Sequence, residues 1–519
     1  MKLQSLCLAI AAGVVGLSAS AAEHVTVTPA WDRLNPADTI PAEIYGQFAE
    51  HLGRCIYGGL WVGPESSVPN TDGYRNDVLE ALRALKVPVM RWPGGCFADE
   101  YHWTDGIGPR ENRPRMVNSN WGGTIEDNSF GTHEFFNLCE LLGCEPYLSG
   151  NVGSGTVEEL AKWVEYITAE DGPMAQRRKD NGREKPWRLK YLGVGNESWG
   201  CGGNFTPEDY AGAYRRYQTY CRDFNGNRLY KIASGASDYD YNWTDVLMQK
   251  ARNHMNGLSL HYYTCAGWTG SKGAATQFSD DDYYWTLGKC LEIEPVIERH
   301  DSIMSVYDPD KRIALLVDEW GTWWDQEPGS VPGHLYQQNT MRDAMVAALS
   351  LNVFHRHTDR VKMANIAQIV NVLQAMILTD DTRMALTPTY HVFRMYAPHQ
   401  DAMVVPLDIA TSSREVRGAR RVPRVSATAS EKDGVLTVTL ANTDLRQSAD
   451  VTIPLGGRKG GKPTAEILTA KSISDYNDFD SPERVKPDRF DKVKLAKDNL
   501  SLTMPPMSII SISLPLSDK

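Results

Sequence analysis

The stretch Tyr191–Gly203, YLGVGNESWGCGG, decides the fold assignment. It holds a short apolar run, and Asn196 and Glu197 follow where a buried strand should end. A strand that stops at an Asn-Glu pair delivers a carboxylate to the rim of a sheet. The stretch Ile313–Trp324, IALLVDEWGTWW, repeats this pattern and ends its apolar run at Asp318-Glu319. These two carboxylates are distant in sequence, and their function depends on whether the fold brings them to one rim.

Length and composition limit the class to which the protein can belong. A chain of 519 residues favours one large domain plus a smaller one. Hydrophobic residues make up 42% and charged residues 23%, which suits a soluble globular protein. The net charge of −11, without any basic cluster, argues against binding nucleic acid or an anionic membrane surface. The 14 Trp and 23 Tyr favour a carbohydrate ligand, because aromatic faces stack on sugar rings.

Residues 1–21 have the pattern of a secretory signal peptide. Lys2 gives the positive start, Leu6–Leu17 the apolar segment, and Ala19–Ala21 an A-x-A cleavage site. A membrane anchor is the weaker alternative, because the apolar run is too short to span a bilayer. We therefore predict that the mature chain is periplasmic or secreted.

Strands and helices alternate through residues 38–396. Eight strand candidates, each followed by a helical pattern, lie near positions 46, 89, 147, 192, 232, 259, 315 and 366. Eight such units over some 350 residues have the size and rhythm of a (β/α)8 barrel, a member of the α/β class. A doubly wound sheet is the structural rival, but no Gly-rich phosphate-binding turn follows the first strand.

The pattern changes after about residue 396. Segment 397–519 has no helical stripe, and its runs alternate strictly between apolar and polar residues at Val435–Ala441, Leu500–Met504 and Ile509–Leu514. Turns rich in Gly, Pro and Asp separate these runs, which predicts a C-terminal all-β sandwich. The isolated strand Val25–Pro29, within segment 22–37, lies outside the eight units and is expected to join this sandwich.

The barrel brings Glu197 and Glu319 to one site. All strands of such a barrel point their C-terminal ends at the same face, where active sites lie. Hydrolysis of a glycosidic bond needs two carboxyl groups, one to give a proton and one to attack carbon or activate water. The alternative is that each Glu is an ion-pair partner on a solvated loop. For one Glu that alternative would win, but two at the rim, each flanked by Trp, favour catalysis.

Other polar and aromatic residues converge on the same face. Polar side chains stand at or beside strand ends at Glu50, Asn196, His261, Tyr263 and Gln368. Candidate sugar platforms are Trp121, Trp199, Trp320, Trp323 and Trp324, of which at least one is expected to be ordinary core. No CxxC pair, HExxH motif or His cluster has metal-ligand spacing, so neither a metal nor a cofactor is expected.

Five stretches taken together resemble glycoside hydrolase family 51, the α-L-arabinofuranosidases. They are IYGQFAEHLGRCIYGGLW, RWPGGCFADEYHW, LGVGNESWGCGGN, LSLHYYT and VDEWGTWW, and the resemblance spans most of the mature chain. It implies a retaining exo-hydrolase that removes terminal α-L-arabinofuranosyl units from arabinoxylan, arabinan or their oligosaccharides. It also implies that Glu197 on the fourth strand is the general acid/base and that Glu319 on the seventh is the nucleophile.

The resemblance extends to the sugar pocket. Residues that match positions lining the pocket or supporting its carboxylates are Glu50, Asn196, His261, Tyr263 and Gln368. Tyr263 is expected to donate to Glu319. The chain departs from the family at Cys96, where many members carry Asn, because a thiol is a poor hydrogen-bond donor. Either another group supplies the missing sugar contact, or Cys96 is bonded to Cys201 and shapes the pocket wall.

Two other functions are compatible with the sequence. One is an endo-acting glucanase or xylanase on the same barrel, because family 51 also contains endoglucanases. The other is a non-catalytic carbohydrate-binding protein, against which the presence of both Glu speaks. Members of the family are often oligomers, so a homo-oligomer is among the expected states, although nothing in the sequence fixes a number.

Overall fold

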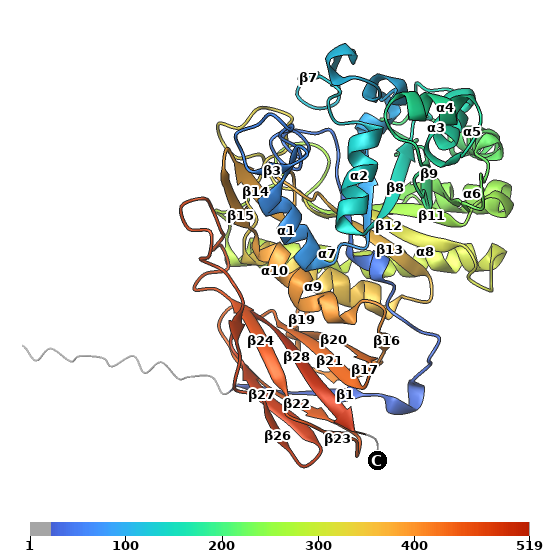
Figure 1. Ribbon diagram of the computed structural model, residues 1–519. Helices are drawn as coiled ribbons and strands as arrows, with labels where there is room; N and C mark the ends of the chain where they lie inside the picture. The colour runs from blue at the N-terminus through green and yellow to red at the C-terminus, as the bar shows by residue number, and fades with distance from the viewer. Residues whose placement is uncertain (1–21, 518–519) are drawn as a thin grey trace, which may run out of the picture.

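A computed structural model of the protein describes residues 22–517, and eight parallel strands within them close into a barrel (Figure 1). The expected signal peptide, residues 1–21, lies outside the described residues. The barrel strands, in the order in which they pair, are β2 (Gly46–Phe48), β5 (Val89–Trp92), β8 (Glu145–Gly150), β9 (Tyr191–Val194), β10 (Tyr230–Ser237), β11 (Gly257–Thr264), β12 (Ala314–Thr322) and β13 (Val361–Ala367). Strand β13 pairs with β2 and closes the ring. The predicted barrel is therefore confirmed.

Helices surround the barrel (Figure 1). They are α1 (Asn76–Leu85), α2 (Thr132–Leu142), α3 (Val157–Thr168), α4 (Pro173–Asp180), α5 (Pro207–Tyr220), α6 (Tyr241–Ala251), α7 (Asp280–Leu291), α8 (Ile293–Tyr307), α9 (Met341–Arg356) and α10 (Pro388–Tyr396). Local sequence explains where several of them begin. Thr156 accepts a hydrogen bond from the Glu159 amide at the start of α3, and Thr206 followed by Pro207 starts α5.

The C-terminal part of the chain forms two packed sheets. One contains β16 (Met403–Val404), β20 (Val425–Lys432), β21 (Val435–Asn442), β28 (Ser508–Ser517), β24 (Thr464–Thr469) and β25 (Asp488–Arg489), with β23 (Lys459–Gly460) beside β28. The other contains β17 (Leu407–Ala410), β1 (Glu23–Pro29), β22 (Ala449–Pro454), β27 (Asn499–Met504) and β26 (Lys494–Ala496). Strand β1, blue in Figure 1, lies among red C-terminal strands, antiparallel to β17 and parallel to β22. Apolar side chains of both sheets form one shared core.

Short elements decorate the loops. The hairpins are β3 (Asn70–Thr71) with β4 (Tyr74–Arg75), β6 (Met116–Val117) with β7 (Ile125–Glu126), β14 (Ile377–Asp380) with β15 (Arg383–Leu386), and β18 (Ser413–Arg414) with β19 (Val422–Pro423). The 3-10 turns are η1 (Trp31–Arg33), η2 (Ala42–Tyr45), η3 (Cys96–Asp99), η4 (Trp103–Gly106), η5 (Arg110–Asn112), η6 (Arg252–His254) and η7 (Ala397–His399). Within residues 22–517, no helix has the length and apolar character needed to span a bilayer.

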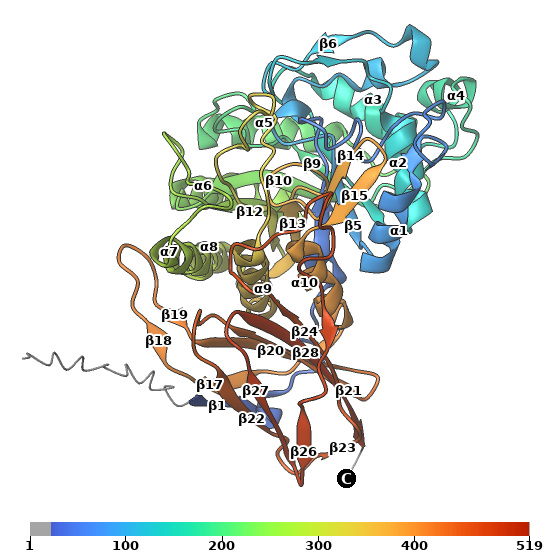
Figure 2. The same ribbon diagram turned by 90° about the vertical axis from the view of Figure 1, so that its left-hand side faces the viewer.

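Helices α9 and α10 lie between the barrel and the sandwich (Figure 2). Every residue of α9 from Met341 to His355 is buried, because the helix contacts α7 and α10 as well as barrel strand β12 and strands β20 and β21 of the C-terminal sheet. Polar groups at the contact with this sheet are paired: Asn352 Nδ2 donates to Ser426 Oγ at 2.9 Å, and His355 lies 3.1 Å from Thr428 Oγ1. The C-terminal sheet therefore supports the barrel through α9.

Candidate active site

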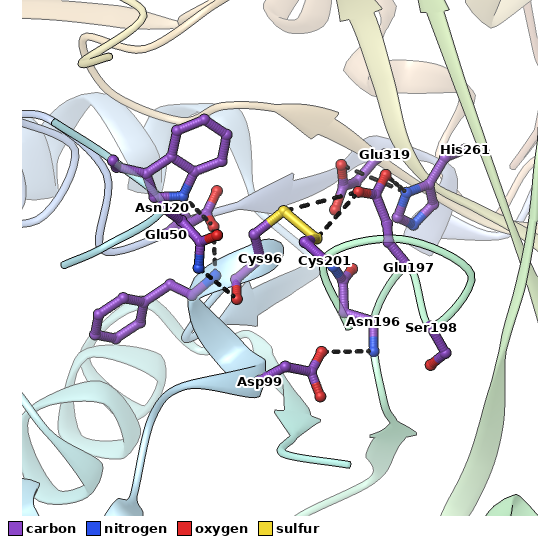
Figure 3. Close-up of a disulfide and its surroundings, with 12 residues drawn as sticks. Glu50, Cys96, Asp99, Asn120, Asn196, Glu197, Ser198, Cys201, His261 and Glu319 are labelled. Carbon is purple, nitrogen blue, oxygen red and sulfur yellow. Dashed lines mark hydrogen bonds and ion pairs between the residues drawn. A yellow bond between two sulfur atoms is a disulfide. The ribbon is translucent and has the colours of Figure 1, made fainter. Parts of the chain in front are cut away.

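The two carboxylates predicted from the sequence meet at the mouth of the barrel (Figure 3). Glu197 follows β9, Glu319 lies on β12, and His261 on β11 stands beside both. One carboxylate oxygen of each Glu and a ring nitrogen of His261 all lie within 4.8 Å of one another. The closure of the barrel therefore brings the ends of two distant segments together around a single site.

A tight turn after β9 aims Glu197 into the mouth. Gly195 has a φ of +91°, and a Cβ there would lie 2.9 Å from Ser198 Oγ, so only glycine fits the turn. Glu197 itself adopts a φ of +40°, a left-handed conformation that side-chain-bearing residues rarely take. Burial raises the pKa of Glu197, and the nearby charge of Glu319 adds to this effect. Both causes favour the protonated carboxyl that a general acid requires.

Two donors bind the carboxyl oxygens of Glu319. Arg91 Nη1 donates to Oε1 at 2.8 Å, and the hydroxyl of Tyr263 donates to Oε2 at 2.9 Å. Arg91 is fully buried, and its charge is balanced by Glu319 and by Asp318, whose Oδ2 lies 3.9 Å from Arg91 Nε. Both carboxyl oxygens of Glu319 are thus fixed in place at the barrel mouth.

His261 links Glu197 to a second buried acid, Asp318. Its Nδ1 lies 2.8 Å from Glu197 Oε1, and its Nε2 lies 3.3 Å from Asp318 Oδ1. Burial opposes the charged ring, but the charges of Glu319 and Asp318 outweigh it and raise the pKa of His261 to about 10. The resulting imidazolium donates to Oε1 of Glu197. The proton of Glu197 is therefore left on Oε2, the oxygen that faces the disulfide at the pocket wall.

Glu50 sits on the opposite side of Cys96 from Glu197 (Figure 3). Its Oε1 accepts from the Phe97 amide at 3.1 Å and from Trp121 Nε1 at 2.9 Å, and its Oε2 accepts from Gln368 Nε2 at 2.9 Å. Burial, with a contribution from the charge of Glu319, raises the pKa of Glu50 to about 7. Gln368 Oε1 is buried without a partner among the described residues, so a protonated Glu50 has an acceptor within reach once that amide rotates.

We expect Glu50→Gln to stabilise the protein in alkaline solution. A carboxyl with a pKa of about 7 when folded and 4.5 when unfolded favours folding less as pH rises between these values. Above neutral pH, ionisation of the buried Glu50 lowers the free energy of unfolding by about 3 kcal/mol. A Gln at this position does not ionise and would avoid that loss. Chemical denaturation at about pH 8 and about pH 4 measures the difference. An equal effect at both pH values would contradict the assignment of a raised pKa to Glu50.

These groups surround a cavity of about 500 Å³ at the barrel mouth. Its lining includes Glu50, Cys96, Trp121, Glu197, Trp199, Asp238, Tyr263, Trp268, Glu319, Trp323 and Gln368. Asn196 lies just beneath, where its Oδ1 accepts from Arg91 Nη2 at 2.5 Å. Its Nδ2 is buried and has no hydrogen-bond partner among residues 22–517.

Cys96 is joined to Cys201 by a disulfide at the pocket wall (Figure 3). The bond connects η3, which follows β5, to the loop after β9. The two sulfur atoms lie 3.8 Å and 3.5 Å from Glu197 Oε2. Because neither sulfur of a disulfide carries a proton, these are packing contacts and not hydrogen bonds. Cys96 therefore shapes the pocket wall beside Glu197, the second of the two alternatives open from the sequence.

The expectation that Trp320 contacts the sugar is wrong. Trp320 is adjacent to Glu319 on β12, and successive side chains of a strand point to opposite faces. Since Glu319 faces the cavity, Trp320 faces the surrounding helices, where it stacks on Phe393 with ring centroids 6.1 Å apart. Its exposed fraction is 1%. Trp324 is also buried, beneath the guanidinium of Arg342, whereas Trp199 and Trp323 do line the cavity.

Sequence reasoning missed several residues of the site. Arg91 carried a usable signal, because a cation inside the apolar strand Val89–Trp92 must be paired when buried. Asp238 and Trp268 carried no signal in the sequence that marked them as site residues. They lie 30 positions apart, and Trp268 Nε1 donates to Asp238 Oδ2 at 3.3 Å on the pocket wall. That contact depends on how two loops approach each other in space.

A larger cavity, of about 760 Å³, lies beside α2 and contains none of these groups. Its arginines are paired with acids of the same cavity, among them Arg113 with Glu134 at 3.1 Å and Arg183 with Glu140 at 2.7 Å. The barrel mouth is the better candidate site, because its donors and acceptors converge on open space.

Two family models match most of the chain. One, described as the α-L-arabinofuranosidase 1 domain, matches residues 81–276, and the other, the α-L-arabinofuranosidase C-terminal domain, matches residues 318–508. An "intracellular exo-α-L-arabinofuranosidase" of Bacteroides ovatus is 65% identical over 96% of this chain and 97% of its own length. A "probable α-L-arabinofuranosidase C" of Aspergillus niger is 33% identical over 84% of this chain and 88% of its own length.

A solved structure agrees with these matches. The crystal structure of an arabinofuranosidase of glycoside hydrolase family 51 from Xanthomonas axonopodis pv. citri superposes with a TM-score of 0.91. It is 47% identical in sequence and covers 95% of this chain and 99% of its own. The similarity therefore includes both the barrel and the sandwich.

The name of the Bacteroides relative corrects one expectation. A chain 65% identical to this one is described as intracellular, which contradicts the periplasmic or secreted location predicted here. That prediction was based on the N-terminal segment, whose short apolar run with an A-x-A end matches the composition of a signal peptide without proving that it is one.

Proposed function

The chain belongs to the α-L-arabinofuranosidases of glycoside hydrolase family 51, and from this premise we propose its mechanism and substrates. We propose that it is a retaining, exo-acting hydrolase that removes terminal α-L-arabinofuranosyl residues from arabinoxylan, arabinan or arabino-oligosaccharides. The observation that carries this proposal is the pair Glu197 and Glu319, with carboxylate oxygens within 4.8 Å of each other at one barrel mouth.

The separation of the carboxylates supports retention of configuration. Retaining glycosidases place their two carboxyl groups about 5–5.5 Å apart, whereas inverting enzymes leave about 6.5–9.5 Å for a water molecule. One carboxyl oxygen of Glu197 lies within 4.8 Å of one carboxyl oxygen of Glu319, a close approach that supports the retaining arrangement. A direct attack by Glu319 on the anomeric carbon is the reaction that fits this spacing.

The reaction proceeds as a double displacement. Glu319 forms a bond to the anomeric carbon while Oε2 of Glu197 gives its proton to the departing glycosidic oxygen. Glu197, now ionised, takes a proton from water, whose oxygen attacks the same carbon and displaces Glu319. Arabinose leaves, and both carboxyl groups return to their starting states. His261 helps both halves, because its ring holds Oε1 of Glu197 in place throughout.

The neighbouring polar groups are proposed to bind the sugar. Asn196 Nδ2 is placed to donate to the 2-hydroxyl, a contact that strengthens as positive charge develops on the ring. Glu50 and Gln368 offer further polar contacts on the far side of the cavity, and Trp121 offers a flat face. A cavity of about 500 Å³ holds one furanose and part of its neighbour, which favours action at chain ends.

Proton NMR of the first product tests this proposal. We expect hydrolysis of nitrophenyl α-L-arabinofuranoside to release the α anomer of L-arabinose first, followed by slow mutarotation. First release of the β anomer would exclude the double displacement. A soluble β-glucan is the matched control substrate, since rapid shortening of that polymer would favour the endo-acting rival. Binding of arabinan without hydrolysis over a day would instead favour a carbohydrate-binding protein.

A further inference from the structure

The disulfide beside Glu197 can be reached from the cavity. Cys201 is exposed and Cys96 is half-buried, whereas the six free cysteines of the described residues are all buried. The Cys96–Cys201 bond is therefore the sulfur site of residues 22–517 that a small dithiol reductant meets first. Exchange with such a dithiol would transfer two electrons and two protons to the pair, giving two thiols and leaving the reductant as a disulfide.

The reduced pair would face the carboxyl oxygen of Glu197 that His261 does not contact. Oε1 of Glu197 is taken up by His261, so Oε2 is the oxygen that faces the two sulfurs. Ligand atoms of Cys96, Cys201 and Glu197 all lie within 4.8 Å of one another. Thiolates and carboxylates are both ligand types of zinc, which binds sulfur at about 2.3 Å and carboxylate oxygen at about 2.0–2.2 Å in a tetrahedron.

The distances fit such a tetrahedron. Those bond lengths place a sulfur ligand and an oxygen ligand about 3.6 Å apart, and two sulfur ligands about 3.8 Å apart. The two sulfur-to-Oε2 distances are already 3.8 Å and 3.5 Å, so only the sulfurs must separate after reduction. A solvent molecule could fill the fourth position from the cavity. With the disulfide intact, neither sulfur can become the thiolate that a metal requires.

We propose that reduction of the Cys96–Cys201 disulfide creates a site for zinc or a similar thiophilic divalent cation, with Glu197 as its third ligand. Binding releases the protons of both thiols and of Glu197, and it ties up the oxygen that must hold the catalytic proton. The enzyme is then inhibited by the metal in its reduced form only. The inhibition rests on the proposed role of Glu197, whereas the metal site itself does not.

Cobalt(II), followed by absorbance, tests for the site without using activity. The intact protein is reduced with a phosphine, freed of reductant without air, and titrated with cobalt; the oxidised protein is titrated in parallel. We expect a thiolate-to-cobalt charge-transfer band that saturates at one equivalent and disappears on addition of zinc, in the reduced protein alone. Cys201→Ser should lose the band, whereas Cys221→Ala, at a buried cysteine outside the cluster, should keep it. No band in the reduced wild type would overturn the proposal.

Activity measurements test the consequence. Zinc is expected to lower the turnover of the reduced enzyme by about 100-fold, the scale of a lost general acid/base, and a chelator should restore it. The oxidised enzyme should keep its rate at the same zinc concentration, and equal inhibition of both forms would overturn the proposal. If neither form hydrolyses arabinofuranosides before metal is added, the proposed function fails, and the cobalt band still decides whether the site exists.

Discussion

Replacement of Glu319 by alanine is expected to abolish turnover while the protein stays folded. Without this carboxylate no covalent intermediate can form, and losing a nucleophile lowers kcat by roughly 10⁵-fold or more. Arg91 would lose one of its two acidic partners but would keep Asp318 nearby and its contact with Asn196. Glu319→Gln is the matched variant, because its amide can still accept from Arg91. Steady-state kinetics, with circular dichroism as the check on folding, give the result.

Chemical rescue of the alanine variant by azide gives a second test of the role of Glu319. The alanine variant leaves space on the side of the sugar from which Glu319 attacks, so azide can enter there. Its product should be the β-configured arabinofuranosyl azide, because a single displacement inverts the anomeric carbon. A Glu319→Ala enzyme with a near-normal rate and no azide product would remove Glu319 from the mechanism.

Glu197→Ala is expected to cause a loss that depends on the leaving group. Arabinan and arabinoxylan leave as poor, strongly basic alkoxides that need a proton, so their hydrolysis should slow by about 10²–10⁴-fold. A dinitrophenyl arabinofuranoside needs no such proton, and its first step should remain fast. A burst of dinitrophenol followed by slow turnover is therefore expected, since the second step still lacks its general base. Pre-steady-state absorbance measures both phases.

Azide distinguishes the two carboxylates. In Glu197→Ala, azide attacks the intermediate on the side that water normally uses, so the product should be the α-configured azide, opposite to that from Glu319→Ala. The Glu197→Gln variant keeps an acceptor for His261 and serves as the control for loss of that contact. Equal slowing of the dinitrophenyl substrate and the polymer would show that Glu197 is not the acid.

The alternation of strand and helix patterns in the sequence was sufficient to predict much of the fold. Strands near positions 192 and 315 could be predicted because each is a buried apolar run, and each ends in the residues that reach the barrel mouth. The helix starts at Thr156 and Thr206 followed from capping chemistry, which needs only neighbouring residues. The resemblance to a family then supplied the roles of Glu197 and Glu319, which the pattern alone had placed at one rim.

The errors arose where short motifs have more than one physical meaning. Trp320 follows Glu319 directly, and its closeness in sequence suggested a shared site although strand alternation turns it away. The N-terminal segment had the composition of a signal peptide, yet a close relative is described as intracellular. In both cases the local pattern was real, but its consequence depended on information outside the motif.

The sequence by itself determined which segments are strands and which residues stand at their ends, because these features depend on periodicity and on neighbours a few positions away. Only the tertiary structure decided that Arg91 neutralises Glu319, that His261 is charged between two acids, and that Cys96 is bonded to Cys201. The reason is physical: charge balance, proton affinity and disulfide pairing depend on distances through space, and those are fixed only when the barrel closes.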